Sequence, residues 1–127
     1  MKIDHIAVSS NSEEKADKFF NNLLGLKKVR SFIVSDDLME QFFKIKREQK
    51  IVRYENEVLR VEAFITDDNS QACDKFTHTC LVIEDRIGLI ERAKNLNIAV
   101  IQVPRKNSEN FYLFLKDSYG NLFEIKS

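Results

Sequence analysis

The sequence predicts an α+β protein built from two similar βαβββ modules. Segments with strand-like alternation and helix-like spacing follow one another in the same order in each half of the chain. A polar stretch at 67–75 separates the halves, and each half has one histidine in its first strand and a glutamate in its last. With 127 residues, the chain is expected to form a single domain, with module 1 at about 1–66, a linker at 67–75 and module 2 at about 76–127.

The first half shows each element through its residue pattern. Ser10 and Glu13 have the spacing of a capping box, and Gly25 suits the end of the helix that follows. The alternation of apolar residues gives the strands, and the acidic pair Asp36 and Asp37 is expected to cap a short helix. The predicted order is a strand at 2–8 with His5, a helix to 24, a strand at 26–34, a short helix from 36, and a hairpin at 50–54 and 58–65 with Glu62.

The second half repeats this order without the short additional helix. A strand at 76–83 carries His78, and a helix opens at Glu84 or Asp85. Strands at 99–103, 111–116 and 121–126 follow, and the last carries Glu124 directly after a tight turn at 117–121. Glu124 stands between Phe123 and Ile125, so it faces away from the core that those two residues enter.

Composition and charge exclude several classes of function. Twenty basic and twenty acidic residues cancel, and no basic run is long enough to follow a nucleic-acid backbone. No apolar run approaches the ~20 residues that a membrane span needs. Cys73 and Cys80 have neither the spacing of a zinc ribbon nor the number of a disulfide scaffold. We therefore expect a cytoplasmic protein with reduced thiols, binding neither nucleic acid nor membrane.

The chain's two histidines and the two strand glutamates form the candidate metal site. His5, Glu62, His78 and Glu124 would give two nitrogen and two oxygen ligands for one divalent ion if both sheets surround one cavity. Zn, Ni, Co, Mn and Fe all suit this donor set. Each residue also has a plain structural interpretation, as a half-buried histidine or a solvent-facing glutamate. The equivalent placement of both pairs favours the metal site.

The sequence resembles the vicinal oxygen chelate superfamily, also called the glyoxalase/bleomycin-resistance/dioxygenase superfamily. The resemblance covers essentially the whole chain, and its most specific part is the last segment. The segments that carry it are 3–8 (Ile-Asp-His-Ile-Ala-Val), 16–20 with 24–26, 76–82 (Phe-Thr-His-Thr-Cys-Leu-Val) and 114–124 (Phe-Leu-Lys-Asp-Ser-Tyr-Gly-Asn-Leu-Phe-Glu).

The resemblance implies an eight-stranded, cup-shaped mixed sheet with helices outside, in a homodimer. His5, Glu62, His78 and Glu124 match the four metal-binding positions of glyoxalase I and, with one substitution, of methylmalonyl-CoA epimerase. This ligand pattern implies a metal-dependent lyase or isomerase that moves a proton in a small carbonyl substrate through an enediolate or enolate. Glu62 and Glu124 would then also serve as catalytic acid and base.

Two other functions are compatible with the same fold. A bleomycin-resistance-like protein binds a small molecule or drug without catalysis, but such members generally lack the four-residue set. An extradiol-type dioxygenase needs only His5, His78 and Glu124. The chain also departs from glyoxalase I, because Ser9 and Ser10 follow the first histidine where that enzyme carries a basic residue. Arg60, Arg105 and Lys106 are alternative anchors for an anionic substrate.

Overall fold

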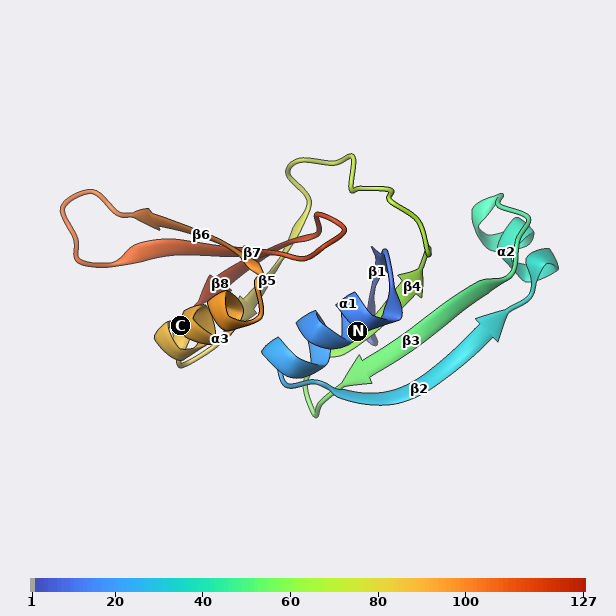
Figure 1. The fold of residues 1–127 in the computed structure, drawn as a ribbon, viewed down its shortest axis with the longest axis horizontal. Helices are drawn as coiled ribbons and strands as arrows, with labels where there is room; N and C mark the ends of the chain where they lie inside the picture. The colour runs from blue at the N-terminus through green and yellow to red at the C-terminus, as the bar shows by residue number, and fades with distance from the viewer. Residues whose placement is uncertain (1) are drawn as a thin grey trace. The chain divides into compact units, whose positions relative to one another are not determined.

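The structure is a computed structural model that describes residues 2–127 (Figure 1). The chain divides into two compact units, of which the first ends at Ser70 and the second begins at Gln71. This boundary falls within 67–75, the polar stretch of the sequence. Each unit has its own sheet and its own buried apolar residues.

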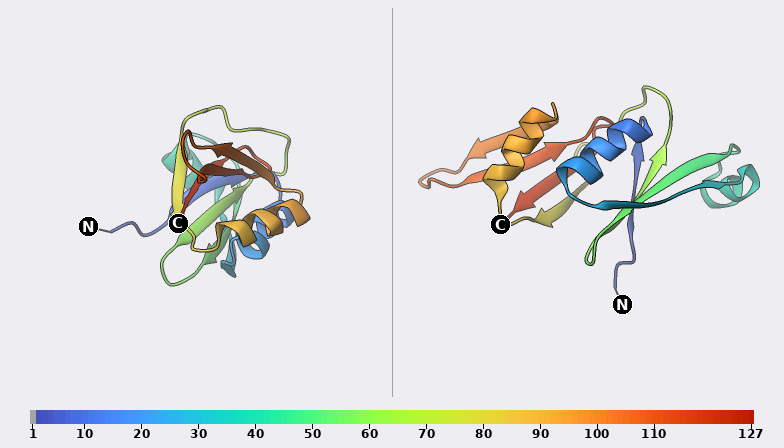
Figure 2. Two further views of the ribbon diagram at one scale, coloured as in Figure 1. Left: turned by 90° about the vertical axis from the view of Figure 1, so that its left-hand side faces the viewer. Right: turned by 60° about the horizontal axis from the view of Figure 1, so that its bottom comes forward.

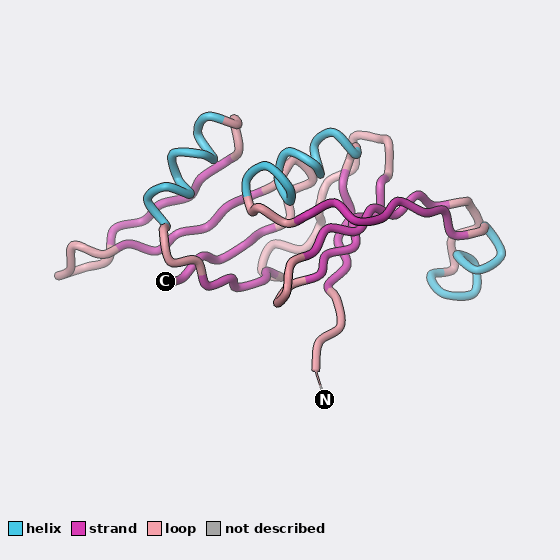
Figure 3. The backbone as a smooth tube through the Cα atoms, turned by 90° about the horizontal axis from the view of Figure 1, so that it is seen from below, coloured by secondary structure: helices cyan, strands magenta, loops and turns pink. Residues whose placement is uncertain are grey.

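The first unit contains a four-stranded sheet with the order β1-β4-β3-β2. β1 is parallel to β4, and the remaining neighbours are antiparallel. α1 runs directly into a π-helical segment, η1, and α2 lies between the ends of β2 and β3 (Figure 3). The elements are β1 (Ile6–Ser10), α1 (Glu13–Ala16), η1 (Asp17–Leu23), β2 (Lys27–Val34), α2 (Asp36–Phe43), β3 (Gln49–Glu55) and β4 (Arg60–Ile65).

The second unit repeats the arrangement with the order β5-β8-β7-β6. β5 is parallel to β8, β6 and β7 form an antiparallel hairpin, and β7 is antiparallel to β8. Its elements are β5 (His78–Val82), α3 (Arg86–Asn95), β6 (Ala99–Pro104), β7 (Phe111–Lys116) and β8 (Leu122–Lys126). The predicted α+β class and the two βαβββ modules are thus confirmed, with the eight strands in two four-stranded mixed sheets.

The helical segment 13–23 covers one face of the first sheet. Phe19 and Phe20 are buried from this segment, and the ring of Phe20 lies 5.4 Å from that of Tyr54 on β3. On the same sheet face, Val61 and Ala63 of β4 are fully buried. Because side chains alternate along a strand, the residues between them point to the opposite face. Glu62 therefore belongs to the face that the segment 13–23 does not cover.

The second sheet is built in the same way around α3. Leu89, Ile90 and Ala93 are the buried residues of α3, which lies along one face of the sheet (Figure 2). Alternate strand residues, Leu113, Leu115, Phe123 and Ile125, are also buried. Glu124 lies between two of these residues in the chain, so it projects from the other face. The predicted alternation around Glu124 is confirmed.

Several local expectations differ from the structure. The first strand begins at Ile6 instead of residue 2, because its partner strand begins only at Arg60 and pairs with it from Ile6 onward. His5 therefore precedes the strand. Ser12, not Ser10, caps the first helix, since Ser10 is still part of β1. Ser35, not Asp36 or Asp37, caps α2. The helix that begins at Glu13 does end as expected at Gly25, which has a φ of 74°.

No helix in residues 2–127 has both the length and the apolar character required to cross a membrane.

Tyr54 makes the stability of the first unit depend on pH in the alkaline range. Its fully buried hydroxyl donates a 2.7 Å hydrogen bond to Oδ1 of Asp17. Burial, and secondly this hydrogen bond, raise the pKa of Tyr54 well above its ordinary value of 10.0. A raised folded-state pKa contributes stability below the unfolded pKa, and this contribution is lost as pH rises through the folded pKa. We expect the free energy of unfolding, measured by urea denaturation, to decline above pH ~10.

Tyr54→Phe tests this prediction, and Tyr112→Phe is its control. The first removes the titrating hydroxyl, costs about 1 kcal/mol at neutral pH and reduces the alkaline decline. The second alters a tyrosine that is 47% exposed and leaves both quantities unchanged. An undiminished alkaline decline in Tyr54→Phe would show that other groups cause it.

Candidate metal centre

His5 and Glu62 form a close pair in the first unit. Nε2 of His5 lies 3.4 Å from Oε2 of Glu62. The register of β1 and β4 explains this approach, because Ala7 lies opposite Glu62 and His5 is two residues earlier on the chain. The Glu62 side chain is 11% exposed and that of His5 is 38% exposed. The pair is therefore accessible from the histidine side.

His78 and Glu124 form the equivalent pair in the second unit. Nε2 of His78 lies 3.5 Å from Oε2 of Glu124. His78 begins β5, and Cys80 lies opposite Glu124 on the parallel neighbour β8. The imidazole also contacts the ring of Phe114 edge-on, at 5.8 Å between centroids. The two modules thus build nearly the same histidine–glutamate contact from equivalent strands.

The hydrogen bonds of the two imidazoles determine which nitrogen faces each glutamate. Nδ1 of His5 lies 2.9 Å from Oδ2 of Asp4, and Nδ1 of His78 lies 2.8 Å from the carbonyl oxygen of Phe76. The hydrogen bond to His5, and then the charge of Arg60, lower the pKa of Asp4, so that its carboxylate is ionised. Both oxygens are acceptors, so Nδ1 donates in each case.

Nε2 is consequently the nitrogen that faces a carboxylate in both pairs. In a neutral imidazole of this tautomer, the lone pair of Nε2 would face the lone pairs of the carboxylate oxygen. This contact is unfavourable unless a proton or a metal ion lies between the two atoms. Histidines that bind metals usually have this arrangement, with the other ring nitrogen held by an oxygen acceptor. The described residues therefore fit a divalent ion chemically. A protonated imidazole paired with the carboxylate is the alternative.

Arg53 distinguishes the first pair from the second. It lies opposite Glu62 in the β3–β4 register, and its Nη2 donates a 2.8 Å hydrogen bond to Oε1 of Glu62. Phe114 occupies the corresponding place opposite Glu124. Besides His78, Glu124 has a basic neighbour in Lys126, whose Nζ lies 3.7 Å from Oε1. Glu62 is therefore held in one orientation by a guanidinium, whereas Glu124 is restrained much less.

The role of Arg53 was not predicted from the sequence. A turn at 55–57 places Arg53 across from Leu59, whereas in the structure Glu55 pairs with Arg60, and Arg53 therefore lies opposite Glu62. Two of the three basic residues proposed instead have other partners. Arg60 binds Glu55 and Asp4, and the guanidinium of Arg105 lies 4.5 Å from the ring centre of Tyr112.

The structure brings the four predicted ligands together as two pairs. Neither unit by itself gathers three His, Cys, Asp or Glu side chains of residues 2–127 in a way that could hold a metal ion. The prediction that all four bind one ion therefore stays a prediction. It requires the pair from the first unit and the pair from the second to meet, within one chain or between two copies.

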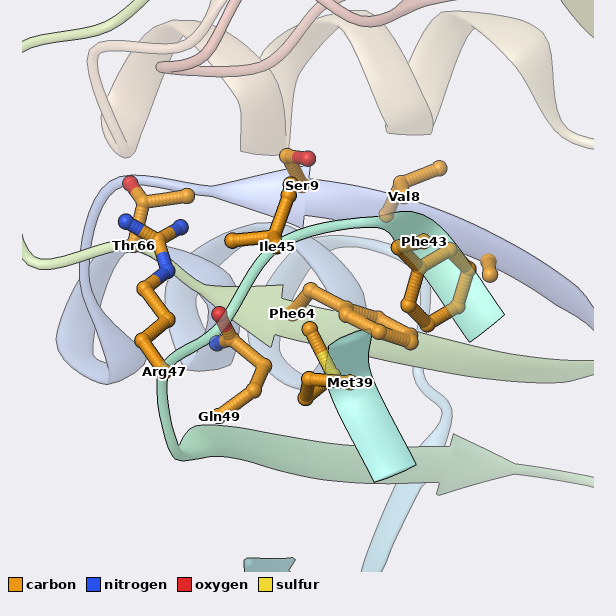
Figure 4. Close-up of a pocket in the computed structure, with 10 residues that line it drawn as sticks. Val8, Ser9, Met39, Phe43, Ile45, Arg47, Gln49, Phe64 and Thr66 are labelled. Carbon is orange, nitrogen blue, oxygen red and sulfur yellow. The ribbon is translucent and has the colours of Figure 1, made fainter. Parts of the chain in front are cut away.

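A pocket of ≈ 270 Å³ lies in the first unit (Figure 4). Its walls come from β1, β4, the start of β3 and the segment from α2 to Arg47. Most of the lining is apolar, and Arg47 is its only charged residue. The lining residues are Ala7, Val8, Ser9, Met39, Phe43, Ile45, Arg47, Gln49, Phe64 and Thr66. The sequence did not indicate this pocket.

Solved structures of similar fold include two FosX proteins. One is the genomically encoded fosfomycin resistance protein FosX of Listeria monocytogenes, solved as a mutant complexed with Mn(II) and 1S,2S-dihydroxypropylphosphonic acid. It matches with a TM-score of 0.71 and 18% identity, over 98% of this chain and 88% of that chain. FosX of Mesorhizobium loti matches with a TM-score of 0.70 and 13% identity, over 98% of this chain and 90% of that chain.

A glyoxalase family protein from Enterococcus faecalis matches over still more of its length. The TM-score is 0.69 at 15% identity, and the match covers 99% of this chain and 97% of the other. This chain has the vicinal oxygen chelate fold. The predicted resemblance is thereby confirmed at the level of the fold, whereas the particular closeness to glyoxalase I stays a prediction. No protein-family model and no curated protein sequence matches the chain.

Proposed function

We propose that this protein is a divalent-metal-dependent enzyme of the vicinal oxygen chelate superfamily, acting on a small carbonyl compound as a lyase or isomerase. The observation that carries the proposal is the repeated contact in which an imidazole Nε2 faces a glutamate oxygen, at 3.4 Å in one module and 3.5 Å in the other. The Mn(II) complex of Listeria FosX supports a divalent ion on this fold.

His5, Glu62, His78 and Glu124 are the proposed ligands of one ion per chain. Because each module supplies only one pair, the complete site needs both modules, and a homodimer would allow each site to take its pairs from two chains. Asp4 and the Phe76 carbonyl hold the imidazoles in the orientation that directs Nε2 to the glutamate of the same module. Zn, Ni, Co, Mn and Fe remain candidates. We place the protein in the cytoplasm, acting on a small molecule.

The proposed chemistry is proton transfer at the carbon next to a carbonyl group. When bound, the ion supplies Lewis-acid stabilisation of the negative charge that develops on the substrate oxygen. Glu124 is the better placed base, because Phe114 instead of an arginine lies opposite it and its side chain is 19% exposed, against 11% for Glu62. Glu62, fixed by Arg53, keeps its orientation while it receives or returns the proton. Isomerisation of a hemithioacetal and epimerisation beside a thioester both fit these roles.

A second candidate is fosfomycin resistance, which the likeness to FosX favours. At 13 to 18% identity, that likeness extends to the fold alone. Non-catalytic binding of a drug and extradiol-type dioxygenation are the other two alternatives. The binder does not require a metal, and the dioxygenase requires Fe(II) and consumes oxygen.

The test is deuterium incorporation from heavy water, followed by mass spectrometry. Metal-free protein is loaded with each of the five ions and incubated with hemithioacetals of methylglyoxal, a chiral thioester, fosfomycin and a catechol. We expect deuterium in the product of a carbonyl substrate only when an ion is present. Turnover of fosfomycin alone would favour the second candidate, and oxygen uptake with the catechol would favour the dioxygenase. Absence of any turnover with all five ions would contradict the enzyme proposal.

A further inference from the structure

The pocket in the first unit lies on the same sheet face as the His5–Glu62 pair. Ala7 lines it and lies opposite Glu62 in the strand register. Phe64, another lining residue, follows Glu62 by two positions on β4 and therefore shares its face of the sheet. Thr66 lies two positions further on. At about 3.4 Å per residue, the level of Glu62 and that of Thr66 are about 14 Å apart along the chain.

The middle of this path is apolar. Met39 of α2 is only 3% exposed, and Phe43 meets the ring of Phe64 edge-on at 5.7 Å between centroids. Ile45 completes this part of the lining (Figure 4). The wall formed by α2 exists only in the first module, because β6 and β7 of the second module are joined by a loop at 105–110 without a helix. The pocket is thus specific to one half of the repeat.

The end of the pocket remote from Glu62 contains Arg47, the one charged residue of the lining. Arg47, Gln49 and Thr66 gather there, away from Phe43 and Val8 (Figure 4). The amide nitrogen of Gln49 already donates to the carbonyl oxygens of Lys50 and Ile65, and the Thr66 hydroxyl is bonded to the Ser10 carbonyl and to Asp68. The guanidinium of Arg47 is exposed, and its charge also acts on the nearby Asp68 carboxylate. It is the one cationic group of the lining that can meet a charged ligand.

We propose that this pocket selects an elongated, singly anionic molecule with an apolar middle. Its reactive end would lie at the His5–Glu62 pair, its apolar part over Phe64 and Met39, and its anionic end at Arg47. This inference rests on the proposed function for the chemistry at the reactive end. It sets the ligand apart from the compact phosphonate found in Listeria FosX, because a single arginine at the far end of an apolar path suits one negative charge.

Octanoate is the probe, with octanol as its neutral counterpart and propylphosphonate as the compact anion. The full chain is labelled at the methionine methyl carbons, and binding is followed by the NMR shift of Met39, whose signal Met39→Leu identifies. We expect octanoate to shift this signal saturably. Arg47→Gln should weaken octanoate binding about fivefold and leave octanol unchanged, since it removes one exposed charge contact. Arg92→Gln, which alters an exposed arginine on α3, should have no effect.

Metal-free protein is used first, so that the result does not depend on the metal site. The same protein is then incubated with zinc. Octanoate binding by the metal-free protein, together with no uptake of zinc, would refute the proposed function and leave the pocket proposal standing. The pocket proposal is overturned by any of three outcomes. These are no shift of Met39, equal affinity for octanoate and octanol in the unsubstituted protein, or tighter binding of propylphosphonate than of octanoate.

Discussion

His78→Ala and His5→Ala are each expected to lower the affinity for a divalent ion by more than ~100-fold. Changes to groups that only support a ligand already cost about 10- to 100-fold, so removing a ligand should cost more. Both histidine side chains are 38% exposed and contribute little to either core, so the variants should stay folded. Metal content after dialysis against a limiting zinc concentration, with circular dichroism to check folding, measures the effect.

Cys80→Ser is the matched control for these variants. Cys80 lies across from Glu124 on the same sheet face, but it is not one of the proposed ligands. The substitution should therefore leave zinc affinity unchanged. If one histidine variant keeps full affinity while the other loses it, the two pairs do not share an ion. If Cys80→Ser also loses zinc, the ligand set is wrong.

Asp117→Ala is expected to destabilise the protein by about 2–4 kcal/mol. Oδ1 of Asp117 accepts hydrogen bonds from the backbone N–H groups of Tyr119, Gly120 and Asn121, and Oδ2 accepts one from Nδ2 of Asn121. Burial raises the pKa of this carboxyl, while the same hydrogen bonds oppose the rise. Removing the carboxylate leaves several partly buried donors without their acceptor, and each costs about 1 kcal/mol or more.

Asp74→Ala provides the comparison in an exposed turn. Asp74 also accepts backbone hydrogen bonds, from Phe76 and Thr77, but it lies at the surface, where water replaces the lost acceptor. Urea denaturation should show a clearly smaller loss for Asp74→Ala than for Asp117→Ala. Equal losses would mean that burial of the turn before β8 contributes nothing. Because β8 carries Glu124, Asp117→Ala should also weaken metal binding.

Alternation and turn chemistry were sufficient to predict most of the fold. The sequence placed Glu124 between two buried residues, and the structure has Phe123 and Ile125 buried on either side. Gly25 ended its helix as expected, because a positive φ is readily available to glycine. The start of β1 was misplaced, because strand length depends on the partner strand, and β4 begins only at Arg60 and pairs with β1 from Ile6 onward.

The candidate site was predictable only in part. The repeat indicated His5, Glu62, His78 and Glu124, and the structure pairs each histidine with the glutamate of its own module. The contact of Arg53 with Glu62 was not predicted, because the expected turn at 55–57 gives a hairpin register three residues away from the observed pairing. The pocket could not be predicted from the sequence. It depends on how α2 packs against Phe64, and the residue pattern of a short helix does not indicate which surface it will pack against.

X-ray absorption spectroscopy of the zinc-loaded full chain tests the central claim most directly, by counting the imidazoles bound to each ion. If His5 and His78 bind the same ion, the spectrum will show two imidazole nitrogens at about 2.0–2.1 Å together with oxygen ligands. One imidazole per ion, or none, would contradict the shared site and the catalytic function proposed from it.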